Sequence, residues 1–391
     1  MDGKRKPDDD ILAGSGAGAD AGAGGGALTL ASKRPRQDDP TPTQALAISS
    51  SDAGKNKGLV RSIKRTSSLS SPIISLSDAH AGEILDVRFS PDGAYLAAAS
   101  ADRSISLWET YGANRNLGLL QGHSKAVTAL AWSGAASAAA PPRLFSASVD
   151  GTLIVWSPLK GVKERRLRGH SATINTVVWC ARGAAAASGR EVVASGSDDG
   201  WVLLWDPEER NPIDKLEIGY PVTALAFSED GKQLFVGSVD NDIHVYDLAK
   251  KQVVYDLWGH TDTITFLSLS PSGNELLSGS LDSTLRVWDI RPFVPQPTHP
   301  AANPRLHRTL SGASAGFESL LIRGCWSRDG RSVAWGGGDR TVTIWDVEKS
   351  LITYKLPGHR GTCTAVDLHP REPIIVSAST DQTLLLGEVE L

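Results

Sequence analysis

The chain has 391 residues, 21% of them charged, and a formal net charge of -4 at pH 7. This balance argues against a protein that tracks a phosphate backbone directly, because that mode of binding needs clustered lysine and arginine. The three cysteines fit no metal or disulfide spacing, and no apolar run approaches the roughly 18 residues of a membrane span. We therefore expect an intracellular protein in a reducing compartment, without a membrane segment, a metal or a cofactor.

Residues 1 to 71 differ in composition from the rest of the chain. Gly and Ala dominate residues 11 to 32, and Ser, Thr, Pro and Lys are frequent in residues 40 to 71. Such segments cannot bury enough apolar surface to offset the entropy lost on ordering, so this tail is predicted to be disordered.

Two short basic clusters lie about 27 residues apart in the tail. A pair of exposed basic runs favours nuclear import over a merely solvated tail. The candidate import residues are Lys4, Arg5, Lys6, Lys33, Arg34 and Arg36. Two further stretches, Lys64 to Ser68 and Ser71-Pro72, have the pattern of protein kinase substrates, although such patterns are common.

A repeated pattern fills residues 72 to 391. In this pattern a histidine is followed nine residues later by a large apolar residue, and a later aspartate is followed six residues later by a tryptophan. The histidines are His80, His123, His170, His260 and His359. The aspartates are Asp102, Asp150, Asp199, Asp240, Asp282, Asp339 and Asp381, which lie 41 to 57 residues apart, and five of them lead to tryptophan. This spacing is close to the roughly 40 to 45 residues of a four-stranded propeller blade.

The pattern resembles the signature of the WD-repeat family, which implies an all-β, seven-bladed propeller over residues 72 to 391. The seventh repeat ends at Leu391 after three strands, so it lacks its outermost strand. Residues Ile73 to Leu76 alternate apolar and polar side chains just ahead of the first repeat. We expect residues 72 to 77 to supply the missing strand, because closing the ring removes an exposed sheet edge.

The constant spacing of His, Ser, Asp and Trp raises the question of a catalytic set. Several near-identical copies in one chain favour architecture instead, because a catalytic triad needs one exposed nucleophile and an oxyanion site. The resemblance to WD-repeat proteins implies a buried hydrogen-bond tetrad within a blade. The expected tetrads are His80, Ser100, Asp102 and Trp108 in blade one; His123, Ser148, Asp150 and Trp156 in blade two; His170, Ser197, Asp199 and Trp205 in blade three; and His260, Ser280, Asp282 and Trp288 in blade five.

Three repeats break this rule. Blade four has Glu217-Ile218 where Gly-His belongs, blade six has Gly316-Phe317 there, and blade seven has Gly387-Glu388 in place of Trp-Asp. Such breaks are expected at functional or junction sites, so we predict that the rim formed by the Gly-His loops binds a protein partner. Candidate contact residues are Tyr220, Arg291, Phe317 and Arg360.

The remaining motifs do not indicate an enzyme. Gly312 to Gly316 matches the G-x-S-x-G nucleophile pattern, but it lies in a small-residue loop of an all-β chain rather than on a strand-turn-helix elbow. The stretch from Arg291 to Phe317 is longer than ordinary connections, so we interpret it as a functional insertion between blades five and six. No catalytic, cofactor-binding or metal-ligating residue is predicted, and no small-molecule substrate.

Several stretches resemble one group of WD-repeat proteins, the WD-repeat subunits of the U5 small nuclear ribonucleoprotein of the spliceosome. They are residues 239 to 243, 287 to 293, 354 to 359 and 373 to 379, together with the ending Leu386-Gly387-Glu388. The resemblance implies a nuclear, non-catalytic scaffold in pre-mRNA splicing. Its implied partners are the large central protein and the RNA helicase of the U5 particle, with the U5 RNA touched mainly indirectly. A substrate receptor of a cullin-type ubiquitin ligase is the alternative, because Trp288-Asp289-Ile290-Arg291 fits the W-D-x-R box of such receptors.

Overall fold

The structure is a computed structural model that describes residues 67–134, 142–181, 191–293 and 303–390. Residues Ser62–Leu391 form one compact unit. The predicted tail, up to residue 66, lies outside the described residues. So do residues 135–141 and 182–190, which make up most of two alanine-rich stretches between the first and second strands of blades two and three. Residues 67 to 71, which the sequence assigns to the tail, are described, and residues 67 to 69 contact the propeller.

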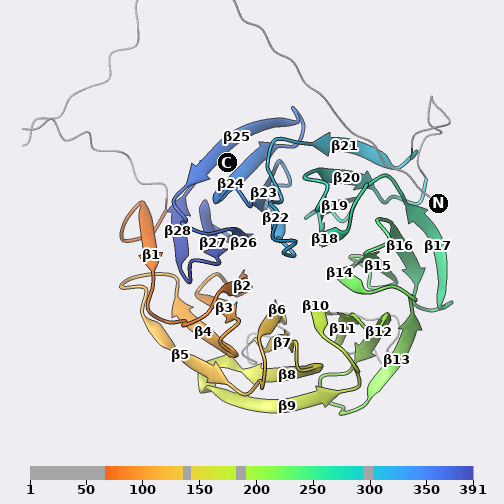
Figure 1. The fold of residues 1–391 in the computed structure, drawn as a ribbon, viewed down its shortest axis with the longest axis horizontal. Helices are drawn as coiled ribbons and strands as arrows, with labels where there is room; N and C mark the ends of the chain where they lie inside the picture. Colours follow the sequence, from red (N-terminus) through yellow and green to blue (C-terminus); the bar gives the residue numbers. More distant parts are fainter. Residues whose placement is uncertain (1–66, 135–141, 182–190, 294–302, 391) are drawn as a thin grey trace, which may run out of the picture. The chain divides into compact units, whose positions relative to one another are not determined.

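The described residues form seven antiparallel sheets of four strands each, arranged as blades around a central axis (Figure 1). From the axis outward, blade one contains β2 (Ile84–Phe89), β3 (Tyr95–Ser100), β4 (Ser104–Glu109) and β5 (Asn116–Gln121). Blade two contains β6 (Val127–Trp132), β7 (Leu144–Ser148), β8 (Thr152–Ser157) and β9 (Val162–Arg168), with a 3-10 turn at Pro158–Lys160. Blade three contains β10 (Ile174–Cys180), β11 (Val192–Ser197), β12 (Trp201–Trp205) and β13 (Pro212–Glu217).

The other four blades follow the same plan. Blade four contains β14 (Val222–Phe227), β15 (Gln233–Ser238), β16 (Ile243–Asp247) and β17 (Gln252–Leu257). Blade five contains β18 (Ile264–Leu269), β19 (Glu275–Ser280), β20 (Leu285–Asp289) and β21 (Leu306–Leu310). Blade six contains β22 (Gly324–Trp326), β23 (Ser332–Gly336), β24 (Thr341–Asp346) and β25 (Leu351–Pro357). Blade seven contains β26 (Cys363–Leu368), β27 (Ile374–Ser379), β28 (Leu384–Glu388) and, outermost, β1 (Ile73–Leu76).

Blade seven is built from both ends of the propeller sequence. β1 pairs antiparallel with β28, from Ile73↔Gly387 to Leu76↔Leu384, and this pairing closes the ring. The prediction that an N-terminal strand completes the seventh blade is confirmed.

The stretch between Arg291 and Phe317 is not a single insertion, contrary to the interpretation from sequence. Its residues Leu306–Leu310 form β21, which pairs with β20 from Leu285↔Leu310 to Trp288↔Leu306. Residues 294–302 lie outside the described part of the chain, and residues 311–323 lead into blade six. Five prolines and a low apolar content hid a strand whose only apolar residues are its two ends, Leu306 and Leu310.

The hydrophobic core lies between neighbouring blades. One apolar cluster, for example, combines Ala97 and Ile105 of blade one with Leu144 and Trp156 of blade two. The second strand of each blade is buried almost throughout, because sheets cover both of its faces, and small or β-branched residues suit this crowded position. Each blade is thus stable only as part of the closed ring.

Side-chain hydrogen bonds join the innermost strands of successive blades. Thr128 donates its hydroxyl to the carbonyl of Ile174 at 2.5 Å, and Thr223 donates likewise to Ile264 at 2.5 Å. Thr364 donates to Ile84 at 2.6 Å, which links blade seven to blade one. These bonds satisfy carbonyls at the start of inner strands, where the ladder bonds end.

In blade six, Arg323 directly precedes β22, one position later in the repeat than Thr128, Thr223 and Thr364 stand in their own strands. The side chain of Arg323 crosses the axis and donates from Nη2 to the carbonyls of Asn175, at 2.6 Å, and Thr128, at 3.3 Å. Its Nη1 lies 3.5 Å from Oδ2 of Asp86, and Arg323 is only 6% exposed. One cation therefore ties blade six to blades one, two and three through the middle of the ring.

Candidate functional site

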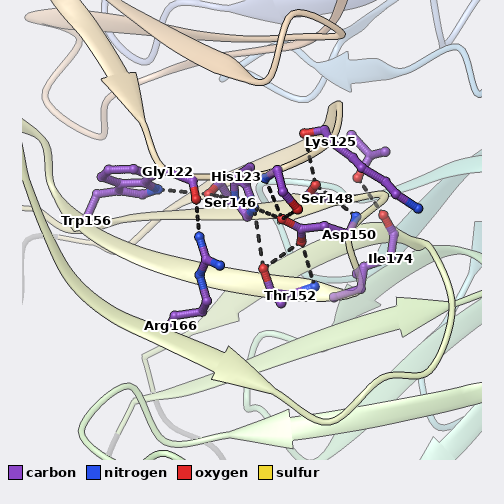
Figure 2. A network of polar contacts seen from close by, with 12 residues as sticks. Gly122, His123, Lys125, Ser146, Ser148, Asp150, Thr152, Trp156, Arg166 and Ile174 are labelled. Atoms are coloured by element: carbon purple, nitrogen blue, oxygen red, sulfur yellow. Dashed lines mark hydrogen bonds and ion pairs between the residues drawn. The ribbon is translucent and has the colours of Figure 1, made fainter.

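The tetrad of blade two shows how the repeated His, Asp and Trp are used (Figure 2). His123 bonds through Nδ1 to Asp150 at 3.2 Å and through Nε2 to the hydroxyl of Ser146 at 2.7 Å. The same hydroxyl accepts the indole N–H of Trp156 at 2.8 Å. The chain of bonds therefore runs from a rim loop through the second strand to the third strand of one blade.

The serines that link histidine to tryptophan are not those predicted. They stand two positions earlier in the second strands of three blades: Ser146, Ser195 and Ser278. Ser377 holds the same place in blade seven and bonds to His359 alone of the two, because this blade has glycine in place of the tryptophan. The predicted residues instead accept the backbone N–H of the aspartate two residues later, at 3.1 to 3.2 Å: Ser100, Ser148, Ser197 and Ser280. Because two residues along a strand span about 7 Å, these serines reach the turn but not the indole. The serine assignment from sequence is corrected accordingly.

Blade one obtains its hydroxyl from a different strand. Ala98 occupies the tetrad position in β3, and its neighbour across the ladder is Ser106 of β4. Ser106 bonds to Nε2 of His80 at 2.8 Å and accepts the indole N–H of Trp108 at 2.9 Å. The hydrogen-bond network is thus kept, although its hydroxyl comes from the third strand instead of the second.

Burial makes these networks structural rather than catalytic. The histidine rings are buried, and burial lowers the pKa of His170, His260 and His359 despite their aspartate partners. Burial alone would raise the pKa of Asp150, but hydrogen bonds from His123, Thr152 and Ser124 hold it well below its usual range. In blades three, five and seven the network therefore pairs a neutral imidazole with an ionised carboxylate. The serine of each network is enclosed in the blade. This fits the architectural interpretation, because a nucleophile must be reachable by substrate.

Two of these serines allow a matched test of the corrected tetrad. Ser278 bonds to both His260 and Trp288, whereas Ser377 bonds to His359 in a blade with glycine in place of tryptophan. We expect Ser278→Ala to lower the free energy of unfolding by about 2 kcal/mol and Ser377→Ala by about 1 kcal/mol, because only the first leaves a buried indole N–H unsatisfied. Urea denaturation of both variants measures the difference. Equal losses would show that the indole bond contributes little.

In blade four the histidine has moved from the rim loop to the third strand. His244 bonds through Nε2 to Asp240 and through Nδ1 to Asp256, each at 2.7 Å. The bond to Asp240, opposed by burial and supported by Asp256, raises the pKa of His244 to about 9. This blade therefore carries an imidazolium, unlike the neutral rings of His170, His260 and His359. Its rim loop, released from holding a histidine, carries Tyr220 instead.

Blade six replaces the tetrad serine with Trp335. Trp335 donates its indole N–H to the carbonyl of Ile322 at 3.3 Å, and Trp345 donates to Ser311 at 3.1 Å. The loop that leads into this blade is held by the N–H of Ala315, which donates to the hydroxyl of Ser283 in blade five at 3.1 Å. Just beyond this anchor, Phe317 is fully exposed.

Three of the four predicted contact residues lie on one rim. Strand directions alternate within each blade, so the loops that enter the innermost strands share a rim with the turns between second and third strands. We call it the histidine rim, after the loop residues His80, His123, His170, His260 and His359. Tyr220, Phe317 and Arg360 lie in these loops, whereas Arg291 follows β20 on the opposite rim and is ion-paired with Asp289. The structure does not bring Arg291 together with the other three.

The histidine rim also exposes apolar residues that the sequence did not single out as contacts. Trp258 is 43% exposed beside the Gly-His pair of blade five, and Val239 is 40% exposed in a turn of blade four. The N–H of Val239 donates to the carbonyl of Pro221 at 3.3 Å, which places it beside the 53% exposed Tyr220. With Phe317, these residues give blades four to six an apolar edge. The tryptophan directly before Gly259 is the sequence signal that indicates this exposed apolar edge.

The remaining predictions concern import, metals and membranes. The six candidate import residues, from Lys4 to Arg36, lie outside the described residues. Over the described ranges, no group of His, Cys, Asp and Glu side chains is arranged to hold a metal ion. In the same part of the chain, no helix has the length and apolar character needed to cross a membrane.

Comparison with known proteins gives first the class and then the family. The WD domain, G-beta repeat, matches residues 70–109, 114–157, 161–206, 212–247, 251–289 and 350–386. These matches cover six blades and omit blade six, the one with tryptophan in place of the tetrad serine. Together with the ring of four-stranded blades, they define a WD-repeat β-propeller.

Similarity to curated proteins is more specific. The chain is 40% identical to the U5 small nuclear ribonucleoprotein 40 kDa protein of Dictyostelium discoideum, over 86% of this chain and 90% of the relative. It is 42% identical to the human protein of the same name, over 83% and 86%. It is 39% identical to the pre-mRNA-splicing factor cwf17 of Schizosaccharomyces pombe, over 84% and 90%. The chain belongs to the family of U5 small nuclear ribonucleoprotein 40 kDa proteins.

Proposed function

We propose that this protein is a non-catalytic scaffold of the U5 small nuclear ribonucleoprotein and acts in pre-mRNA splicing in the nucleus. Its partners would be the large central splicing protein and the RNA helicase of that particle, with the U5 RNA held mainly through them. The basic clusters of the tail would direct import. Membership of the U5 40 kDa family supports the particle assignment.

The observation that carries the scaffold role is the apolar edge of the histidine rim. Exposed aromatic side chains on loops anchored to a rigid ring resemble the anchors that dominate protein interfaces. Tyr220 and Phe317 are both more than half exposed, although a monomer gains nothing from displaying them. Three carboxylates, those of Asp240, Asp242 and Asp256, lie close together in this blade, and burial and the other two carboxylates raise the pKa of Asp242 while His244 lowers it. A protein surface with apolar and basic side chains fits such an edge better than a phosphate backbone does.

The test is affinity purification of the tagged full-length protein from nuclear extract at high salt, with quantification of co-purifying U5 RNA and proteins. We expect the wild type to recover U5 RNA with the large splicing proteins. The double variant Tyr220→Ala/Phe317→Ala should reduce this recovery at least tenfold, because truncation of aromatic anchors typically weakens binding by that factor or more.

The matched control removes two exposed apolar side chains away from the histidine rim, Leu159 and Val162, which border the turn between β8 and β9. Leu159→Ala/Val162→Ala should keep U5 recovery. If the control loses the particle while the rim variant keeps it, docking uses another surface. If the wild type recovers a cullin adaptor without U5 RNA, the splicing function itself is overturned.

A further inference from the structure

A short clasp fastens the start of the propeller to the rim opposite the histidine rim. The hydroxyl of Ser67 donates to Glu388, and the N–H of Ser68 donates to Oε2 of Glu372 at 2.7 Å. Leu69 follows with only 5% of its surface exposed, packed in the apolar cluster of blades seven and one. Residues 67 to 69, with Glu372 and Glu388, are here called the Ser67 clasp.

The clasp lies where the ring depends on a strand from the other end of the chain. Pro72 accepts the N–H of Glu388 at 3.0 Å, so the first clasp carboxylate belongs to the strand that pairs with β1. Glu372 also accepts the hydroxyl of Tyr111 at 2.9 Å, which connects the clasp to blade one. β1 has four residues, of which only Leu76 is buried. Closure of blade seven therefore rests on a short strand, and the clasp adds two hydrogen bonds and the buried Leu69 to it.

The polarity of the clasp makes it sensitive to added negative charge. The two hydrogen bonds that join residues 67 and 68 to the rest of the propeller both run from a serine to a carboxylate, and the hydroxyl of Ser67 also accepts the N–H of Leu69 at 3.2 Å. A phosphate on Ser67 would remove the hydroxyl donor, add three acceptor oxygens and place about 1.5 to 2 negative charges beside Glu388. Such a group next to acidic side chains disrupts by repulsion and lost hydrogen bonding.

The sequence around the clasp carries the charge pattern that protein kinases select. Lys64 and Arg65 precede Ser67 by three and two positions, and they precede Ser68 by four and three. Ser68 is exposed and Ser67 is partly exposed. A protein kinase can therefore bind the segment when this end of the propeller opens locally.

We propose that Ser67 is a phosphorylation site and that its phosphate opens the Ser67 clasp and releases β1 from β28. A basophilic protein kinase transfers the γ-phosphoryl group of ATP to Oγ of Ser67. The Oγ–P bond forms, the bond between the γ-phosphorus and the β,γ-bridging oxygen breaks, and ADP and the hydroxyl proton leave. The modified chain then holds blade seven as three strands with an unpaired outer edge. This inference does not depend on the splicing role proposed above.

The test compares hydrogen exchange in variants of the full-length protein. Phosphoserine incorporated at position 67 should accelerate amide exchange in residues 73–76 and 384–388 at least tenfold relative to wild type. Ser67→Glu should act in the same direction, and Ser67→Ala, which loses the hydrogen bonds of the hydroxyl to Glu388 and Leu69 without adding charge, should act less. Ser67→Glu combined with Glu388→Gln should return exchange to the level of Ser67→Ala, because the repulsion is then removed.

The matched control is Ser71→Glu, an exposed serine four residues further on that also precedes Pro72. It should leave exchange in the two segments unchanged. The kinase step is tested with ATP and the catalytic subunit of cAMP-dependent protein kinase on the wild-type chain, followed by peptide mass spectrometry. Phosphate found only at other residues would overturn the site. Wild-type protection in the protein with phosphoserine at 67, for instance because neighbouring Arg371 pairs with the phosphate, would overturn the opening.

Discussion

Replacing Arg323 with methionine is expected to lower the free energy of unfolding by about 3 kcal/mol, because the substitution breaks a buried ion pair and removes two hydrogen bonds at once. Arg323 fills the centre of the ring, where its guanidinium bonds to the carbonyls of Asn175 and Thr128 and faces Asp86. Burial lowers the pKa of Arg323, against the attraction of Asp86. Asp86 keeps Arg88 at 3.4 Å, so the loss should fall toward the lower part of the range for broken buried pairs.

Arg328→Met is the matched control, since this arginine lies exposed in the next turn of the same blade. Urea denaturation should show the loss for Arg323→Met and a change within about 0.5 kcal/mol for the control. A double variant with Asp86→Asn should lose less than the sum of the single losses, because the two groups interact directly. Equal stability of Arg323→Met and Arg328→Met would mean that the blades need no tie across the axis.

The sequence predicts the propeller but not the contacts that Arg323 makes across its axis. The regular distances from histidine to large apolar residue and from aspartate to tryptophan are set within one blade, so a single chain displays them many times. Ring closure followed from counting strands, because blade seven lacked one. Arg323, in contrast, contacts carbonyls 148 and 195 residues earlier in the chain. Only the closed geometry reveals which blades face each other across the axis.

The tetrads show where spacing stops being informative. Ser146 and Ser148 occupy the same strand at a constant distance from the aspartate, and the chain repeats both serines in several blades. To choose between them, one must know which serine lies level with the imidazole and the indole N–H, and the sequence alone does not show this. In blade one the hydroxyl comes from Ser106 in the neighbouring strand, so the network persists where the pattern is lost. The placement of Tyr220, Phe317 and Arg360 on one rim, in contrast, could be predicted, because blades four and six break the histidine rule in their own loops. That this rim binds a partner stays a prediction.

Blade four is expected to lose stability at alkaline pH through His244. This imidazole lies between two carboxylates, and the bond to Asp240 is the largest reason that its pKa rises from the ordinary 6.5 to about 9. A group whose pKa is higher in the folded than in the unfolded chain stabilises fully below the unfolded value. That contribution disappears as pH rises through the folded value. The window is therefore about pH 6.5 to 9, within which the folded ring is charged and the unfolded one is neutral.

The expected size follows from the same shift. At about 1.4 kcal/mol per pK unit, the contribution of His244 is about 2 to 3 kcal/mol near pH 7, the lower value allowing for the fifth of its side chain that remains exposed. Urea denaturation at pH 7 should therefore find His244→Gln less stable than wild type by this amount, and at pH 10 the gap should close. His307→Gln serves as the control, because His307 is nearly half exposed and pairs with Glu275 alone. A gap that stays the same at pH 10 would show that His244 acts through its shape and hydrogen bonds rather than its charge.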